Sequence, residues 1–211
     1  MAQMTKERWI KSYSRKKAPP HWALSLAPSK LAGNFLCVIK KGKILEIGCG
    51  NGRDSLFFAR HGFDATGIDL SAEAIKLARE NSKKVKISGK ILFKVADAEK
   101  LPFPARAFDG VYSIGVLHST NLNKSLPEIT RVMKPGGTAL LHLWQKTYFL
   151  KTKKTEVLCS PAKLKSVLKQ LPFKIIMFRD SVSTGKTDYE DGVKNAHRHF
   201  AIIVKLKKDA A

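Results

Sequence analysis

A short apolar segment, Lys43–Ile47, runs directly into three glycines at alternate positions, Gly48, Gly50 and Gly52. An apolar run that stops at glycine predicts a buried strand, and the apolar spacing over 54–61 predicts a helix directly after the turn. Glycines let a backbone turn tightly and approach a ligand closely, and the following helix points its free N–H groups at that ligand. The chain is therefore expected to contain a strand, turn and helix unit that binds a ligand.

The rest of the chain alternates between the same two kinds of element. Short apolar runs predict further strands at 65–68, 91–95, 108–113, 138–144, 173–178 and 200–206. Helical spacing and capping residues predict further helices at 72–81, 124–133 and 161–171. Strands alternating with helices form a parallel sheet covered on both faces. The predicted fold is α/β: a Rossmann-like, doubly wound, mostly parallel seven-stranded sheet with helices on both faces and an antiparallel last strand.

Two details of this prediction depend on single features. Pro127 lacks a backbone N–H, so it is expected in the first turn of the helix at 124–133. Residues 179–197 are polar and are expected to form a long connection between the last two strands.

Charge is the unusual part of the composition. The 211 residues include 39 Lys and Arg against 17 Asp and Glu, a net charge of +22, while 44% are hydrophobic, as in a globular domain. The basic excess lies in the two flanks. We therefore divide the chain into a basic N-terminal segment and candidate lid, residues 1–35, and a main domain, residues 36–211. A positive surface attracts polyanions or membrane surfaces but does not determine a fold.

The expected compartment follows from what the sequence lacks. Three cysteines, Cys37, Cys49 and Cys159, cannot all pair, and their spacing fits no zinc site. No apolar core of a signal peptide follows the first residues, and no apolar run approaches the about 20 residues that span a bilayer. We expect a cytoplasmic protein with no membrane insertion and no metal site. The sequence identifies no protein partner.

The spacing of the glycines restricts the class of ligand that this turn can bind. A dinucleotide fingerprint requires glycine where Arg53 stands, and a P-loop requires a Gly-Lys-Ser/Thr that is absent. Glu46, inside the strand, would repel a pyrophosphate but would attract an ammonium or sulfonium group. The expected ligand is therefore cationic and not phosphorylated.

At this point the chain resembles the class I S-adenosylmethionine-dependent methyltransferases. Glu46–Gly52 is similar to the first motif of that family, and Asp69 ends the second strand where the family has its ribose-binding carboxylate. Three later segments are also similar: Asp97-Ala98 with Leu101-Pro102-Phe103, Phe108–Ile114, and Arg131–Gly137. The resemblance covers about residues 40–145.

The resemblance implies S-adenosyl-L-methionine as methyl donor and S-adenosyl-L-homocysteine as product. It implies in-line attack by an acceptor nucleophile, with much of the rate from proximity and orientation. It also implies a set of cofactor-binding residues: Glu46, Gly48, Cys49, Gly50, Asn51, Gly52, Asp69, Leu70, Asp97, Ala98 and Ser113.

Several acceptor classes are disfavoured by the residues after the fourth strand. Exocyclic-amine methyltransferases carry an Asn/Asp-Pro-Pro-Tyr/Phe turn there, whereas this chain has Ser113–Val116. Cytosine C5 methylation needs a nucleophilic cysteine, and none of the three is placed for it; each is expected to be a small buried residue. His118 follows the fourth strand and is the candidate general base, with a packing role as the alternative.

Aromatic residues near the N-terminus are candidates for the lid. Trp9, Tyr13, His21 and Trp22 lie in one segment that either closes over the cofactor or packs on the sheet as an amphipathic helix and loop.

The acceptor stays open between RNA and a small molecule, with RNA slightly favoured. Basic runs at 15–17 and 151–154 near aromatic residues suit looped or single-stranded RNA, and Ser113–His118 with Leu143-Trp144 resembles the tRNA wobble-uridine methyltransferases. Gly52–Phe63, in contrast, resembles the small-molecule tellurite-resistance and thiopurine methyltransferases. The alternative from another class is a non-catalytic basic RNA-binding module on the same fold.

Overall fold

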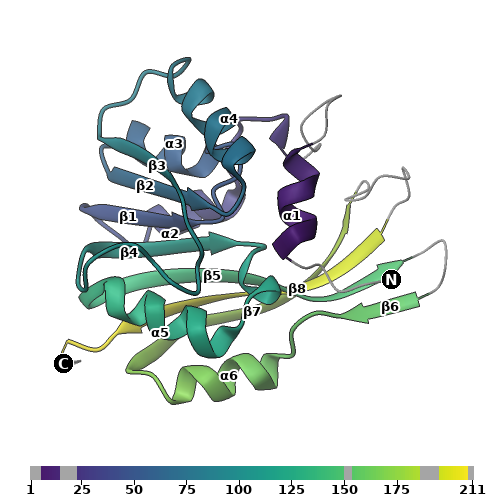
Figure 1. Cartoon of the computed structure of the whole chain (residues 1–211). Helices are drawn as coiled ribbons and strands as arrows, with labels where there is room; N and C mark the ends of the chain where they lie inside the picture. The colour runs from purple at the N-terminus through teal and green to yellow at the C-terminus, as the bar shows by residue number, and fades with distance from the viewer. Residues whose placement is uncertain (1–5, 15–22, 150–153, 186–194, 209–211) are drawn as a thin grey trace.

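A single twisted sheet organises the molecule (Figure 1). The computed structural model describes residues 6–14, 23–149, 154–185 and 195–208. The strand order is β3-β2-β1-β4-β5-β8-β7, and a further strand, β6, pairs with β5 outside this order. The strands are β1 Lys43–Ile47, β2 Asp64–Asp69, β3 Ile91–Val95, β4 Phe108–Ile114, β5 Met133–Phe149, β6 Lys154–Val157, β7 Phe173–Gly185 and β8 Asn195–Leu206. β1 to β5 are mutually parallel, and β8 runs antiparallel to both β5 and β7. The predicted fold class is confirmed.

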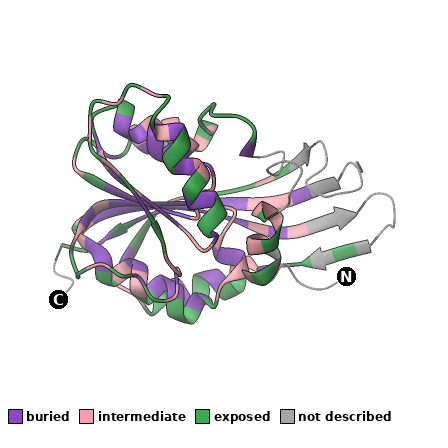
Figure 2. Cartoon of the chain, turned by 45° about the horizontal axis from the view of Figure 1, so that its top comes forward, coloured by how far each residue is buried: buried purple, intermediate pink, exposed green. Residues whose placement is uncertain are grey.

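Helices cover both faces of the sheet (Figure 1). They are α1 Lys6–Tyr13, α2 Lys30–Leu36, α3 Arg53–Arg60, α4 Ala72–Ser82, the 3-10 turn η2 Leu117–Ser119, α5 Leu122–Val132 and α6 Pro161–Lys169. α2 and α3 share one apolar cluster with β1 and β4, whereas α5 and α6 pack into the cluster on the opposite face. The outer faces of the helices are exposed and the sheet between them is buried (Figure 2). None of the helices in the described ranges is long and apolar enough to cross a membrane.

Local sequence explains where these helices begin. Ser29, Ser71 and Ser160 each accept a hydrogen bond at an N-cap, and Pro161 occupies the first position of α6. The N-cap Ser71 also donates its N–H to Asp69 at the end of β2, so α4 starts at the carboxyl ends of the strands.

The sheet changes direction between β1 and β4. From β1 the chain builds outward through β2 to β3, then returns to place β4 against the other side of β1, with Ile47 opposite Ser113. The carboxyl ends of β1 and β4 thus meet at a topological switch point, where open α/β sheets bind their ligands.

The structure corrects the predicted bounds of several elements. β5, β7 and β8 are longer than expected, so residues 179–185 and 195–197 are strand rather than a loose connection. β6 was not predicted. α5 starts at Leu122, which puts Pro127 inside the helix; Asn123 and Pro127 are exposed, so water can serve the carbonyl that loses its helical donor.

Three further expectations concern the boundary between the two segments, the burial of the cysteines and several residues near the basic flanks. α2 spans positions 35 and 36, where the two segments were divided, and its Phe35 is fully buried. Cys49 and Cys159 are buried as expected, but Cys37 is exposed because it follows the end of α2. His21, Trp22 and the residues at 15–17, 151–153 and 186–194 lie outside the described residues.

Candidate active site

The turn after β1 is held open by its glycines. Gly48, Gly50 and Gly52 have φ angles of 75°, 54° and 82°, in the left-handed region that favours glycine. The N–H groups of Gly48 and Cys49 both donate to the carbonyl of Ile68 at the end of β2, at 2.7 and 2.9 Å. A Cβ at Gly48 would collide with Val116. The backbone therefore passes close to both neighbouring strand ends, as a ligand-binding turn requires.

Asp69, at the end of β2, forms hydrogen bonds that fix its carboxylate against this turn. Its Oδ2 accepts the N–H of Gly50 at 3.0 Å, and its Oδ1 accepts the N–H of Ser71 at 2.9 Å. Burial raises the pKa of Asp69, against the effect of the backbone donors. The carboxylate is fixed in direction, and each oxygen keeps a lone pair for a ligand.

Glu46 is a buried carboxylate with one close partner, the hydroxyl of Ser55. Burial, reinforced by the negative charge of Asp54, raises the pKa of Glu46 well above its usual value. Asp54 itself accepts hydrogen bonds from the N–H of Ser29 at 2.7 Å and the hydroxyl of Tyr112 at 3.3 Å. Glu46 thus lies in a place where a cation would relieve an unfavourable charge.

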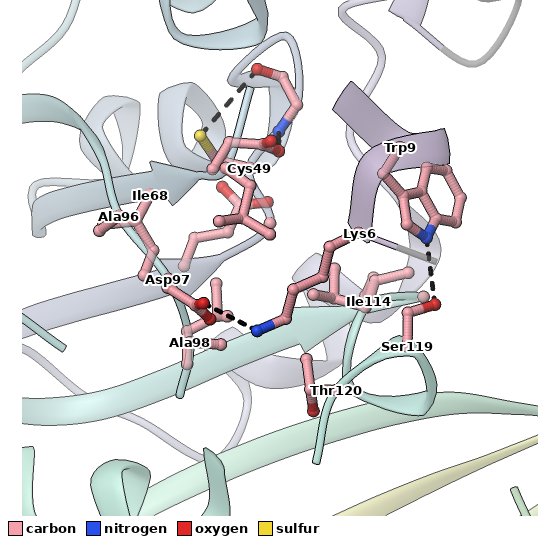
Figure 3. Close-up of a pocket in the computed structure, with 18 of the residues that line it drawn as sticks. Lys6, Trp9, Cys49, Ile68, Ala96, Asp97, Ala98, Ile114, Ser119 and Thr120 are labelled. Carbon is pink, nitrogen blue, oxygen red and sulfur yellow. Dashed lines mark hydrogen bonds and ion pairs between the residues drawn. The ribbon is translucent and has the colours of Figure 1, made fainter. Parts of the chain in front are cut away.

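A third carboxylate comes from the segment after β3. Asp97 Oδ2 lies 2.7 Å from the Nζ of Lys6, and Glu99 Oε1 lies 2.8 Å from the same nitrogen. Trp9, one turn further along α1, donates from Nε1 to the hydroxyl of Ser119 at 3.1 Å. These contacts hold α1 across the strand ends (Figure 3).

A cavity of about 240 Å³ lies beneath α1. Its lining takes in nine of the residues predicted for the cofactor: Glu46, Gly48, Cys49, Gly50, Asn51, Asp69, Leu70, Asp97 and Ala98. Residues that were predicted at the ends of β1, β2 and β3 thus lie around one cavity.

Three other predicted residues do not line the cavity. Gly52 is the N-cap of α3, and Ser113 is fully buried with its hydroxyl on the carbonyl of Ile47. His118, the candidate general base, is 4% exposed and stacks on Trp144 with ring centroids 5.2 Å apart. Burial, with smaller contributions from His142 and His197, lowers the pKa of His118 to about 3. His118 is thus a neutral ring behind the cavity wall and does not face the space where an acceptor would lie.

The opposite wall was predicted only in part: Trp9 and Tyr13, the lid candidates, line the cavity. The lining residues that were not predicted come from α1, from the segment after β4 and from β5: Lys6, Gly115, Val116, Ser119, Thr120 and Trp144. Gly115 has a φ of 66° and, as a glycine directly after a strand, gave a signal that could have been used. Lys6 gave none, because its partners are more than 90 positions away.

The donor set of the cavity fits S-adenosylmethionine. Three carboxylates at separate points, Glu46, Asp69 and Asp97, accept hydrogen bonds and favour cationic groups. S-adenosylmethionine offers an ammonium, a ribose diol and an exocyclic amine. A dinucleotide would instead bring its pyrophosphate to the buried carboxylate of Glu46, at the cost of charge repulsion.

The comparisons with known proteins agree with this geometry. Residues 45–141 match the family model described as "Methyltransferase domain". An O-methyltransferase from Aspergillus nomiae is 31% identical over 160 residues, which cover 70% of this chain and 71% of that relative. An O-methyltransferase from Pyrenophora dematioidea is 37% identical over 96 residues, which cover 44% of this chain.

Among solved structures, an S-adenosylmethionine-dependent methyltransferase from Methanosarcina mazei is 26% identical. It superposes with a TM-score of 0.65 over 86% of this chain and 99% of that one. For most of the curated relatives the match spans about a third of their own length, for example 36% of the Pyrenophora dematioidea enzyme.

Proposed function

This chain belongs to the S-adenosylmethionine-dependent methyltransferases, and on that premise we propose that it methylates an oxygen of a small organic acceptor. When bound, the donor supplies a methyl group on a positively charged sulfur, whose carbon–sulfur bond breaks as the acceptor's lone pair bonds to that carbon. The chain's own residues bind the donor, orient the acceptor and exclude water.

Donor binding is assigned to the three carboxylates. Glu46 would hold the ammonium group, because its buried charge has no cationic partner that touches it within the described residues. Asp69 would hold the ribose diol with the lone pairs left by Gly50 and Ser71. Asp97 would accept from the adenine amine, as the family resemblance implies. The residues 1–35 contribute α1, which we propose acts as a lid over the donor.

The observation that carries the small-molecule assignment is the position of α1. Trp9 and Tyr13 on this helix line the cavity, and the hydroxyl of Tyr13 reaches the glycine turn, 2.6 Å from where a Cβ at Gly50 would stand. A covered cavity of this kind suits a compact acceptor that is enclosed during transfer. The O-methyltransferase relatives support an oxygen nucleophile.

The test combines donor binding with acceptor screening. Calorimetry should detect S-adenosylmethionine binding to the wild-type chain, and Asp69→Ala should abolish it. The protein should then transfer labelled methyl from the donor to members of a panel of phenols and alcohols, and not to total RNA. Donor binding without transfer to any hydroxyl compound would contradict the acceptor assignment.

The second candidate acceptor is RNA, which the net charge of +22 favours. The resemblance of Ser113–His118 to the tRNA wobble-uridine enzymes points the same way, whereas that of Gly52–Phe63 to the tellurite-resistance branch supports a small molecule. RNA nucleosides from cells with and without the protein separate the two: loss of one methylated nucleoside would establish RNA. RNA binding with a steep salt dependence, but without methyl transfer, would instead support the non-catalytic module.

A further inference from the structure

The indole of Trp144 is stacked against two histidine rings. His118 stacks on one side with ring centroids 5.2 Å apart and an interplanar angle of 14°. His197 stacks on Trp144 at 4.8 Å and 26°. Trp144 lies near the carboxyl end of β5, His197 near the start of β8 and His118 in η2, so three separate elements hold this column of rings.

Trp144 also lines the cavity. Nε1, on the edge of its indole, lies 3.8 Å from where a Cβ at Gly115 would stand. No hydrogen-bond acceptor for this N–H is found in the described part of the chain, and the atom is not among the buried polar atoms without partners. The edge thus carries an accessible donor beside the end of β4.

The other indole of the cavity differs in this respect. Trp9 already donates its N–H to Ser119, and its ring lies 6.5 Å from that of Trp144 at an angle of 59°. Trp9 therefore closes the cavity from the lid, while Trp144 faces the interior with an unused donor.

The cavity offers an acceptor few groups to receive its proton. His118 stacks on Trp144 and does not line the cavity, and Lys6 is engaged by Asp97 and Glu99. A hydrogen-bond donor stabilises an oxygen anion. Without a facing histidine, the acceptors best suited to this wall are hydroxyl groups that ionise readily, namely phenols and enols.

We propose that the Nε1–H of Trp144 donates a hydrogen bond to the nucleophilic oxygen of a phenolic or enolic acceptor, and that His118 and His197 are positioning residues that hold the indole edge-on. This inference rests on the proposed function, because it assigns a role to one wall of the same cavity.

The experiment follows the indole N–H directly by nuclear magnetic resonance. The chain has three tryptophans, whose ¹⁵N-labelled indole signals are assigned with Trp9→Phe, Trp22→Phe and Trp144→Phe. The protein is loaded with S-adenosylhomocysteine and titrated with 4-nitrophenolate as the probe. The Trp144 signal should move downfield and saturate, and Trp144→Phe should bind the probe roughly tenfold more weakly. Replacement of the exposed His61, which does not line the cavity, by Gln is the control and should leave the Trp144 shift in place.

The outcomes distinguish this inference from the proposed function. Failure of the wild type to bind S-adenosylhomocysteine, measured before the probe is added, would count against the proposed function. A loaded protein that does not bind the probe, or that binds it with an unmoved Trp144 signal or with equal affinity in Trp144→Phe, would overturn the inference alone.

The positioning role of His118 is tested separately with two variants of that residue. His118→Phe keeps a ring against Trp144 and should keep both the shift and the affinity, whereas His118→Ala should broaden the Trp144 signal and weaken probe binding. Equal behaviour of His118→Ala and the wild type would contradict the positioning role.

Discussion

The ammonium of Lys6 lies 2.7 Å from the carboxylate of Asp97, although the two residues are 91 positions apart in the sequence. This ion pair joins α1 to the segment after β3 and places a cation on the carboxylate proposed to accept from adenine. Glu99 is a second partner of Lys6 at 2.8 Å. We expect Lys6 to keep Glu99 as a partner when Asp97 binds the donor, which would couple the docking of α1 to donor binding.

Lys6→Met should make the donor dissociate faster. The ion pairs of Lys6 are partly exposed, and such pairs contribute about 1 kcal/mol or less, which corresponds to an increase of up to about fivefold in the dissociation rate. Stopped-flow fluorescence measures it. Lys11→Met, an exposed lysine on the same helix, should leave the rate unchanged. High salt should reproduce the Lys6→Met effect in the wild type and add little in the variant.

Glu46→Gln should stabilise the empty protein and weaken donor binding. Burial raises the pKa of Glu46, so the folded state loses stability as pH rises from the ordinary pKa of a glutamate toward the raised value. The neutral amide removes this cost, and the melting temperature at neutral pH should rise. Donor affinity should fall by roughly tenfold or more, because the charged partner of the ammonium is lost.

The same titration makes donor binding dependent on pH. An ammonium beside Glu46 stabilises the ionised carboxylate, so binding should release a proton and tighten as pH rises through the raised pKa. Calorimetry in buffers of different ionisation enthalpy counts that proton. Proton release of equal size in Glu46→Gln would contradict the assignment.

Acid should destabilise the fold through buried histidines. Burial lowers the pKa of His118 to about 3 and that of His142 to about 4, with smaller contributions from neighbouring histidines. In the unfolded chain both titrate near the ordinary value of 6.5. The stability they provide is therefore complete above about pH 6.5 and falls with acidification through these lowered values, by up to about 1.4 kcal/mol per pH unit for each histidine.

Urea unfolding from pH 7.5 to 4.5 measures this slope. His118→Phe should make the slope shallower by one histidine's share, whereas replacement of the exposed His61 by Gln should leave it unchanged. An unchanged slope in His118→Phe would show that another group drives the acid transition.

Substitution of two glycines by alanine distinguishes the cost of backbone strain from the cost of a steric clash. Gly48→Ala and Gly62→Ala both force a side chain onto a left-handed backbone, with φ angles of 75° and 82°. Nothing lies within 4 Å of a Cβ at Gly62, whereas one at Gly48 meets Val116. Gly62→Ala should cost about 1 kcal/mol of unfolding free energy and keep donor binding. Gly48→Ala should cost about 2 kcal/mol or more and lose donor binding, as thermal unfolding and calorimetry would measure.

The sequence predicted the side of the site that is built from the ends of β1, β2 and β3, because local residue patterns specify these strands. β1 and β3 begin and end where predicted because apolar runs bounded by turn residues specify them. Asp69 and Asp97 fall at strand ends, and parallel strands bring such ends to one edge of a sheet. The end of β7 and the start of β8 were missed because residues 179–185 and 195–197 are mostly polar and carry little apolar signal.

The other half of the site depends on contacts between distant segments. The pairing of Lys6 with Asp97 and of Trp9 with Ser119 joins positions 91 and 110 apart, which no local pattern specifies. His118 was located correctly along the chain, but its orientation depends on the ring of Trp144 from another strand. For that reason the sequence could not distinguish a base that faces the cavity from a ring behind its wall.

The most direct test of the account is the crystal structure of this protein grown with S-adenosylhomocysteine. We predict density for the ligand beneath α1, with both ribose hydroxyls within hydrogen-bond distance of Asp69 and the amino group beside Glu46. An empty cavity at saturating ligand, or the ligand bound at another place on the molecule, would contradict it.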